Sequence, residues 1–301
     1  MIARTTAVVE AGGVLGEMTC APPLTLRQVH SESRDRCELR LVGTAAGPLA
    51  GDDLSVWLGL RPDAKATLRA TGASVAQGQG DAAALSIRAD LADGAKLVAD
   101  PGALVVCRGS RIDVRVELTL GAGAAVEWRE LIVLGRTGEP PGRATLRWDV
   151  TRLGRPVLRQ FLDLDLDLTA GRRVLACALI TGPAVAPRTV VAAATAVAQQ
   201  VDDHTLLVTV LDDDAARASR QLDELCAQAL VLPGAGGRAV ATQDLGAVPV
   251  PRRGGPVRVA DQGPAHPVNH HLMVIKAQQD AIFEISFAAV ALVLEVVHLA
   301  R

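Results

Sequence analysis

Apolar and polar residues alternate in three stretches of the chain, at residues 54–60, 85–91 and 114–120. An alternation with a period of two places every second side chain on the same face of a β-strand. The first stretch, for example, has leucine or valine at positions 54, 56, 58 and 60. The pattern therefore predicts three strands, each with one buried face.

The same features follow each of these predicted strands. A short turn leads to an alanine (Ala64, Ala95 or Ala124), and a second apolar stretch then ends at a glycine. That glycine lies at the same offset from the alanine in all three cases, at Gly78, Gly109 and Gly138. A fixed repeat is typical of stacked units that each contact their neighbours, and such stacks present surface instead of enclosing a catalytic cleft.

The predicted fold class is all-β, with stacked and helically wound sheets that resemble a solenoid and a small α/β or helical C-terminal part. We divide the chain into four parts on its changes of composition. These are a β-rich stacked-sheet body at residues 1–180, a small α/β module at 181–250, a linker rich in Pro, Gly and Arg at 251–267, and an apolar segment, expected to be helical, at 268–301.

Local signals predict several elements within these parts. Residues 146–150 and 157–168 read as a hairpin joined at Leu153-Gly154. Residues 189–198 and 205–211 read as strands. A helix is expected from the three aspartates at 212–214 to about Leu230, because an acidic residue can cap the free amides at a helix start.

The apolar run at residues 281–300 has three interpretations. It can form a helix packed on the body or on a partner, since apolar residues recur at alternating spacings of three and four. It can cross a membrane, although Glu284 and Glu295 make that costly, and we expect no membrane span. It can also be a tail unrelated to the rest of the fold.

Composition excludes some classes of function. The net charge of −2 offers no basic surface for nucleic acid. The five cysteines are widely spaced without a CxxC pair, and the first residues lack the apolar core of a signal peptide, so we expect free thiols and a cytoplasmic protein. The chain contains neither the phosphate-binding pattern GxxxxGK[ST] nor the hydrolase pattern GxSxG.

Two groups of residues could interact with a metal ion. His266, His270 and His271 could hold zinc or nickel, or could belong to a solvated loop in which Pro267 prevents a helix from aligning them. Three aspartates, Asp163, Asp165 and Asp167, alternate with leucines, so a strand would carry the carboxylates on one face. That face could be solvated, or it could meet a cation or a basic partner, because aligned like charges repel.

Three segments, at residues 47–53, 68–75 and 129–139, resemble the urease accessory protein family UreD, called UreH in some organisms, in its actinobacterial form. Their order and spacing carry the resemblance, which extends over about residues 22–230. The last forty residues depart from the family pattern.

The resemblance implies a non-enzymatic β-rich scaffold that docks on apo-urease with UreF-like and UreG-like partners and conducts nickel to the urease active site. No tightly bound cofactor is expected, and nickel would pass transiently. By position, the ion path would involve Asp52, Thr71, Ser74 and Glu130, with Asp53, Asp163, Asp165 and Asp167 as secondary candidates. Two alternatives remain open: a metal-dependent hydrolase that uses the three histidines, and a purely structural β-solenoid adaptor.

Overall fold

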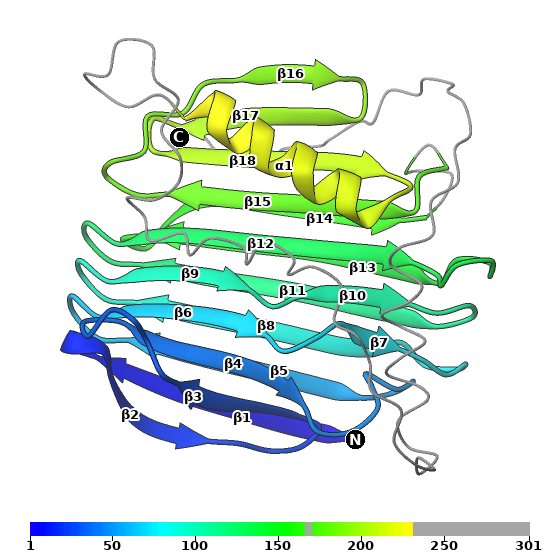
Figure 1. Cartoon of the computed structure of the whole chain (residues 1–301), viewed down its shortest axis with the longest axis horizontal. Helices are drawn as coiled ribbons and strands as arrows, with labels where there is room; N and C mark the ends of the chain where they lie inside the picture. Colours follow the sequence, from blue (N-terminus) through cyan, green and yellow to red (C-terminus); the bar gives the residue numbers. More distant parts are fainter. Residues whose placement is uncertain (166–168, 170, 231–301) are drawn as a thin grey trace, which may run out of the picture.

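Two β-sheets lie face to face in the computed structural model (Figure 1). Through most of the described chain, the backbone passes back and forth from one sheet to the other. The structure describes residues 1–165, 169 and 171–230. In Figure 1 the strands of the blue to green part of the chain stack broadly in sequence order, and a helix lies across the upper strands. The predicted all-β stacked fold with a small helical part is therefore confirmed.

The first sheet has seven strands, in the order β14-β13-β11-β8-β5-β1-β2. The five inner strands run parallel, whereas β2 and β14 pair antiparallel at the two edges. The strands are β1 (Ile2–Glu10), β2 (Val14–Thr19), β5 (Asp53–Leu60), β8 (Ala83–Leu91), β11 (Arg111–Leu120), β13 (Arg143–Arg152) and β14 (Arg155–Leu164). A short 3-10 helix, η1 (Ala11–Gly13), joins β1 to β2.

The second sheet has eleven strands, nine of them in the order β16-β17-β18-β15-β12-β9-β6-β4-β3. The other two, β7 and β10, pair with each other, and β10 also pairs with β12. The strands are β3 (Leu24–Val29), β4 (Cys37–Gly43), β6 (Lys65–Ala70), β7 (Ser74–Ala76), β9 (Lys96–Asp100), β10 (Ala103–Val106), β12 (Ala125–Leu134), β15 (Val174–Thr181), β16 (Val190–Ala193), β17 (Ala196–Asp202) and β18 (Thr205–Asp212).

The repeat seen in the sequence corresponds to successive coils of the chain. Leu54 is in register with Leu85, and Leu85 with Val114, so the three alternating stretches are neighbouring parallel strands. The turn alanines of the three units are buried at the passage from one sheet to the other. The glycines that close each unit have positive φ angles, a conformation that glycine adopts without strain.

The core lies between the sheets and is built mainly from leucine, valine and alanine. A second apolar cluster lies on the outer face of the larger sheet, under α1 (Ala215–Ala229). The predicted helix is confirmed: Asp214 is its N-cap, and the Asp214 side chain accepts a hydrogen bond from the backbone N–H of Arg217 at 2.6 Å.

The structure corrects one predicted element. Residues 189–198 do not form a single strand, because the chain reverses between β16 and β17 to form an antiparallel hairpin. The reversal falls within an alanine-rich run that has no glycine or proline to signal a turn. The predicted linker at 251–267 and the apolar segment at 268–301 lie outside the described residues. Within the described residues, no helix is both long enough and apolar enough to cross a membrane.

Candidate functional site

A small cavity lies between the two sheets and has a volume of about 20 Å³. That volume has room for about one water molecule. Leu24 and Leu41 of the larger sheet line it on one side, and Leu85, Ile87 and Val114 of the seven-stranded sheet on the other. Residues 101–104 close it further, and among the described residues only Ser74 and Glu130 contribute polar side chains to its lining. The cavity is therefore an apolar chamber with two oxygen-bearing groups.

Strand pairing brings Ser74 and Glu130 together although they are distant in the sequence. Ser74 on β7 is in register with Leu104 on β10, and Ala103 on the same strand is in register with Leu131 on β12. The turn into β10 depends on Gly102, whose φ is +84° and where an added Cβ would lie 2.7 Å from the Cβ of Ala70. Two of the four primary ion-path candidates thus line one interior cavity.

Glu130 is 5% exposed, and its carboxyl accepts a hydrogen bond from the indole N–H of Trp128 at 2.7 Å. Burial raises the pKa of Glu130 to about 8, an effect that the Trp128 hydrogen bond opposes and the charge of Asp100 reinforces. The carboxyl is therefore largely protonated at neutral pH. It can bind a cation only by releasing that proton, so cation binding at this site is coupled to proton release.

Sequence reasoning did not identify Trp128 as the partner of Glu130. The signal was available, because residues two apart on a strand share a face. A buried carboxyl needs a hydrogen-bond partner to offset the loss of water, and the indole N–H of Trp128 supplies one.

Asp52 does not line the cavity but lies just before β5, where its side chain is 5% exposed. Its carboxylate accepts hydrogen bonds from the amino group of Met1 at 2.8 Å and from the backbone N–H of Leu49 at 2.9 Å. Burial acts to raise the pKa of Asp52, but these two bonds outweigh it, and the pKa lies below its ordinary value. Asp52 is therefore an ionised group that stabilises its own turn.

The Asp52 turn is nevertheless joined to the strand that carries Ser74. The backbone N–H of Val75 donates to the carbonyl of Gly47 at 3.3 Å, and that of Gln77 donates to the carbonyl of Pro48 at 2.9 Å. The segment 47–53 therefore lies against β7. Together with β12, this brings residues of all three resemblance segments to one end of the core.

The remaining primary candidate, Thr71, is exposed at the end of β6. Its hydroxyl donates to the carbonyl of Leu41 at 3.4 Å, and Leu41 itself lines the cavity. The secondary candidate Asp53 is exposed as the first residue of β5. Thr71 thus adjoins the cavity from outside.

Asp163 and Asp165 are not part of the cavity lining. Asp163 is half-buried on β14 opposite Thr145, and Asp165 forms an ion pair with Arg143 at 3.0 Å. Asp167 and the three histidines, His266, His270 and His271, fall outside the described residues. Among the residues that the structure describes, no group of three or more His, Cys, Asp and Glu side chains could hold a metal ion. All five cysteines are free thiols.

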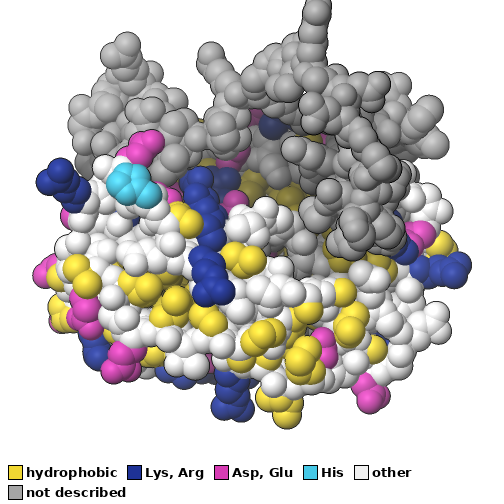
Figure 2. All heavy atoms as spheres, turned by 60° about the horizontal axis from the view of Figure 1, so that its bottom comes forward, with side chains coloured by type: hydrophobic (Ala, Val, Ile, Leu, Met, Phe, Trp, Pro, Cys, Tyr) yellow, Lys and Arg dark blue, Asp and Glu magenta, His cyan; other side chains and the backbone are white. Residues whose placement is uncertain are grey.

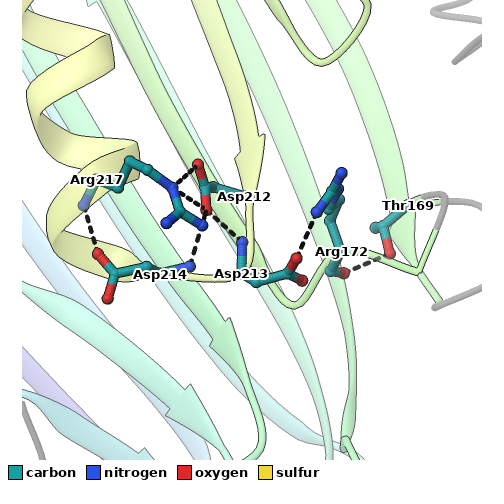
Figure 3. A network of polar contacts seen from close by, with 6 residues as sticks. All are labelled: Thr169, Arg172, Asp212, Asp213, Asp214 and Arg217. Carbon is teal, nitrogen blue, oxygen red and sulfur yellow. Dashed lines mark hydrogen bonds and ion pairs between the residues drawn. The ribbon is translucent and has the colours of Figure 1, made fainter. Parts of the chain in front are cut away.

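A second polar network stands at the start of α1 (Figure 3). Arg217 contacts Asp212 on β18, and Arg172 reaches Asp213 from the turn before β15. Together with the Asp214 cap, these contacts fix the passage from β18 into the helix. The network accounts for the three consecutive aspartates as structural residues.

Comparison with known proteins gives a consistent result. The family described as UreD urease accessory protein matches residues 4–243. The protein named "Urease accessory protein UreD 1" from Streptomyces griseus is 40% identical over 131 residues, which are 43% of this chain and 51% of that protein. "Urease accessory protein UreD" from Parafrankia sp. is 33% identical over 251 residues, 72% of this chain and 84% of that protein.

A third relative has the same name as the second. "Urease accessory protein UreD" from Streptomyces coelicolor is 32% identical over 227 residues, 70% of this chain and 89% of that protein. The chain thus spans about half of the Streptomyces griseus protein and most of the other two.

Proposed function

The chain belongs to the UreD family of urease accessory proteins, and from this membership we propose that it is a scaffold in urease maturation that docks apo-urease and conducts nickel toward it. The family is one of accessory proteins, not of enzymes. The partners we propose are the urease structural subunits and accessory proteins of the UreF and UreG types. The observation that carries the nickel part is the cavity between the sheets, where Ser74 and Glu130 meet.

The chemistry of the cavity suits transient passage of a divalent cation. A hydroxyl and a carboxylate are oxygen donors that hold such an ion weakly, whereas a cluster of thiolates and imidazoles would retain it. Burial keeps Glu130 mostly neutral, and an arriving cation would convert it to an anion by replacing its proton. Asp52 is an ionised group in the turn that bonds to β7, and we assign it to the approach of this path.

Docking has support from the surface at the N-terminal end of the stack. Figure 2 shows this end, where apolar side chains are spread between charged ones. Met1, Ile2 and Val14 on and beside β1 and β2 are more than half exposed. Large exposed apolar side chains favour burial against a partner.

The test is a co-purification combined with an activation assay. The tagged chain would be co-expressed with urease structural subunits and the two other accessory proteins, and urease activity would be followed after nickel, bicarbonate and GTP are added. Glu130→Gln and Asp52→Asn would be measured singly and together. Glu117→Gln on β11 is a matched control, because Glu117 pairs with Arg115 away from the cavity lining.

We expect the double variant to recover the same partners as the unmodified chain but to activate urease several-fold more slowly. Normal activation by a folded, docked double variant would refute the nickel path and leave the purely structural adaptor. Failure of the unmodified chain to recover urease would refute docking. Tight stoichiometric metal and turnover by the chain alone would instead favour the metal-dependent hydrolase.

A further inference from the structure

Gln160 on β14 carries a buried amide side chain. Its side chain is 4% exposed, and neither its Oε1 nor its Nε2 has a hydrogen-bond partner among the described residues. The indole N–H of Trp148 on β13 is likewise buried and without a partner there. Buried polar groups in folded proteins almost always bond to protein or to ordered water. Two such groups side by side therefore point to a ligand.

Register shows that these two residues belong to a row that begins at the cavity. Ile87, which lines the cavity, is in register with Val116, and Val116 is in register with Trp148. Trp148 is in turn directly opposite Gln160. The row crosses β8, β11, β13 and β14 on the inner face of the seven-stranded sheet.

The larger sheet carries a corresponding row. Glu130 on β12 is in register with Cys177 on β15, and Cys177 with Thr209 on β18. Cys177 and Thr209 are buried, and the thiol lies 3.9 Å from the hydroxyl. This row also begins at a residue that lines the cavity, because Glu130 is its first member.

Both rows of residues run from the cavity toward the same edge of the two-sheet stack, the edge that β14 and β18 approach. Across the core, strand β14 contacts β17, which is the neighbour of β18 in the larger sheet. Arg152 at the end of β13 bonds to Asp202 on β17 at 3.2 Å and to Thr205 on β18 at 3.0 Å. Strands β13 and β14 therefore face β17 and β18, and the two rows enclose one strip of the interior.

We propose that this strip, bounded by Glu130, Cys177 and Thr209 on one sheet and by Trp148 and Gln160 on the other, is a hydrated branch of the cavity. Water molecules bind there to the Gln160 amide and the Trp148 indole, and they accompany a divalent cation held at Glu130. The cation part rests on the proposed function, whereas the water part stands on the unpartnered groups alone.

Water fits the groups that are present. The amide of Gln160 offers two N–H donors and an acceptor oxygen, the indole offers one donor, and the Thr209 hydroxyl can both donate and accept. A buried water needs two to four such partners, and a single protein group facing these atoms would not satisfy them all. A divalent cation that keeps part of its hydration shell also needs oxygen-lined space beside its carboxylate.

The first test replaces Gln160 by leucine, a side chain of similar volume without polar atoms. Gln160→Leu breaks no hydrogen bond to a described protein group, so we expect a melting temperature close to that of the unmodified chain. We also expect urease activation in the full accessory complex to slow several-fold. Gln200→Leu on β17 is the matched control, since Gln200 is exposed, and it should leave activation unchanged.

The two proposals can fail separately. If Glu130→Gln slows activation and a stable Gln160→Leu chain does not, the hydrated branch is refuted and the nickel path stands. If neither variant slows activation and the double variant of Glu130 and Asp52 is also normal, the nickel path itself is refuted.

A second measurement does not depend on the variant. A high-resolution crystal structure of the chain in its accessory complex should show ordered water within hydrogen-bond distance of Gln160 Nε2 and of Trp148 Nε1. An amide that is bonded entirely to protein groups, with no water in the strip, would overturn the inference even if the variant failed to fold.

Discussion

At the scale of single residues, Glu130 shows how a fold changes the chemistry of one side chain. The same carboxyl would be ionised at neutral pH on the surface, but burial between two sheets favours its neutral form. The nearby thiol of Cys177 responds in the same way, because burial raises its pKa to about 12. Both groups are therefore uncharged in the resting core, which avoids the cost of an isolated buried charge.

The raised pKa of Glu130 predicts a pH-dependent stability. Above pH 4.5 the unfolded chain releases this proton, while the folded chain keeps it up to about pH 8. The unmodified chain therefore loses stability as pH rises through this window, by at most about 1.4 kcal/mol per pH unit. Glu130→Gln removes the penalty, so its free energy of unfolding should increase relative to that of the unmodified chain between pH 4.5 and 8, as measured by urea unfolding.

Comparison of the two chains at each pH cancels the titration of all other groups. Glu117→Gln, which removes an ion-paired carboxylate outside the cavity lining, should show no such rise. A difference between Glu130→Gln and the unmodified chain that stays constant from pH 4.5 to 8 would show that Glu130 is not held neutral.

At the scale of elements, the hairpin of β13 and β14 contains a residue poorly suited to its conformation. Its two-residue turn is formed by Leu153 and Gly154, with φ angles of +50° and +74°. Such a turn favours asparagine followed by glycine, because asparagine tolerates positive φ and leucine does not. Leu153 is also 66% exposed, so its apolar side chain contributes little packing.

Leu153→Asn should therefore raise the free energy of unfolding by roughly 1 kcal/mol. Leu153→Ala is the control, because it removes the same apolar side chain but keeps the unfavourable φ, and its effect should be small. Urea unfolding at constant pH measures both. Equal effects of the two substitutions would mean that exposure, and not backbone conformation, decides the stability of this turn.

At the start of α1 we predict a substitution that lowers stability. Asp214 caps the helix by accepting the Arg217 N–H bond, at the end of the network in Figure 3. Asp214→Ala leaves that amide without its partner and should lower the free energy of unfolding by about 1 kcal/mol. Asp203→Ala, at an exposed turn, should change it little. No loss in Asp214→Ala would indicate that water replaces the cap.

These elements also show how far sequence reasoning reaches. The alternation at residues 54–60, 85–91 and 114–120 predicted neighbouring strands because one face of each is buried. The meeting of Ser74 with Glu130 could not be predicted, since it depends on the short strands β7 and β10 pairing across a gap of many residues. In the sequence Gln160 is indistinguishable from an exposed polar residue of a strand. It is buried because the second sheet covers the face of β14 on which it lies.

At the scale of the whole molecule, the larger sheet runs without a break from the coiled body into the C-terminal strands. Strand β15 pairs with β12 on one side and with β18 on the other. Leu175, Leu179 and Leu207 belong to the same core as the leucines of the coils. Arg129 of β12 also forms an ion pair with Asp223 of α1, so the helix is tied directly to the body.

This continuity predicts that the described part of the chain unfolds as one unit. The three tryptophans, Trp57, Trp128 and Trp148, report on the coiled body, and hydrogen exchange of α1 amides reports on the far end of the sheet. Their urea midpoints should coincide, because loss of β15 and β18 would expose the inner faces that cover the coils. If α1 amides lost protection at lower urea than the tryptophan transition, the described residues after 181 would unfold separately from the coiled body. The proposed nickel path would then be closed at one edge of the two sheets by strands that can open without unfolding of the body.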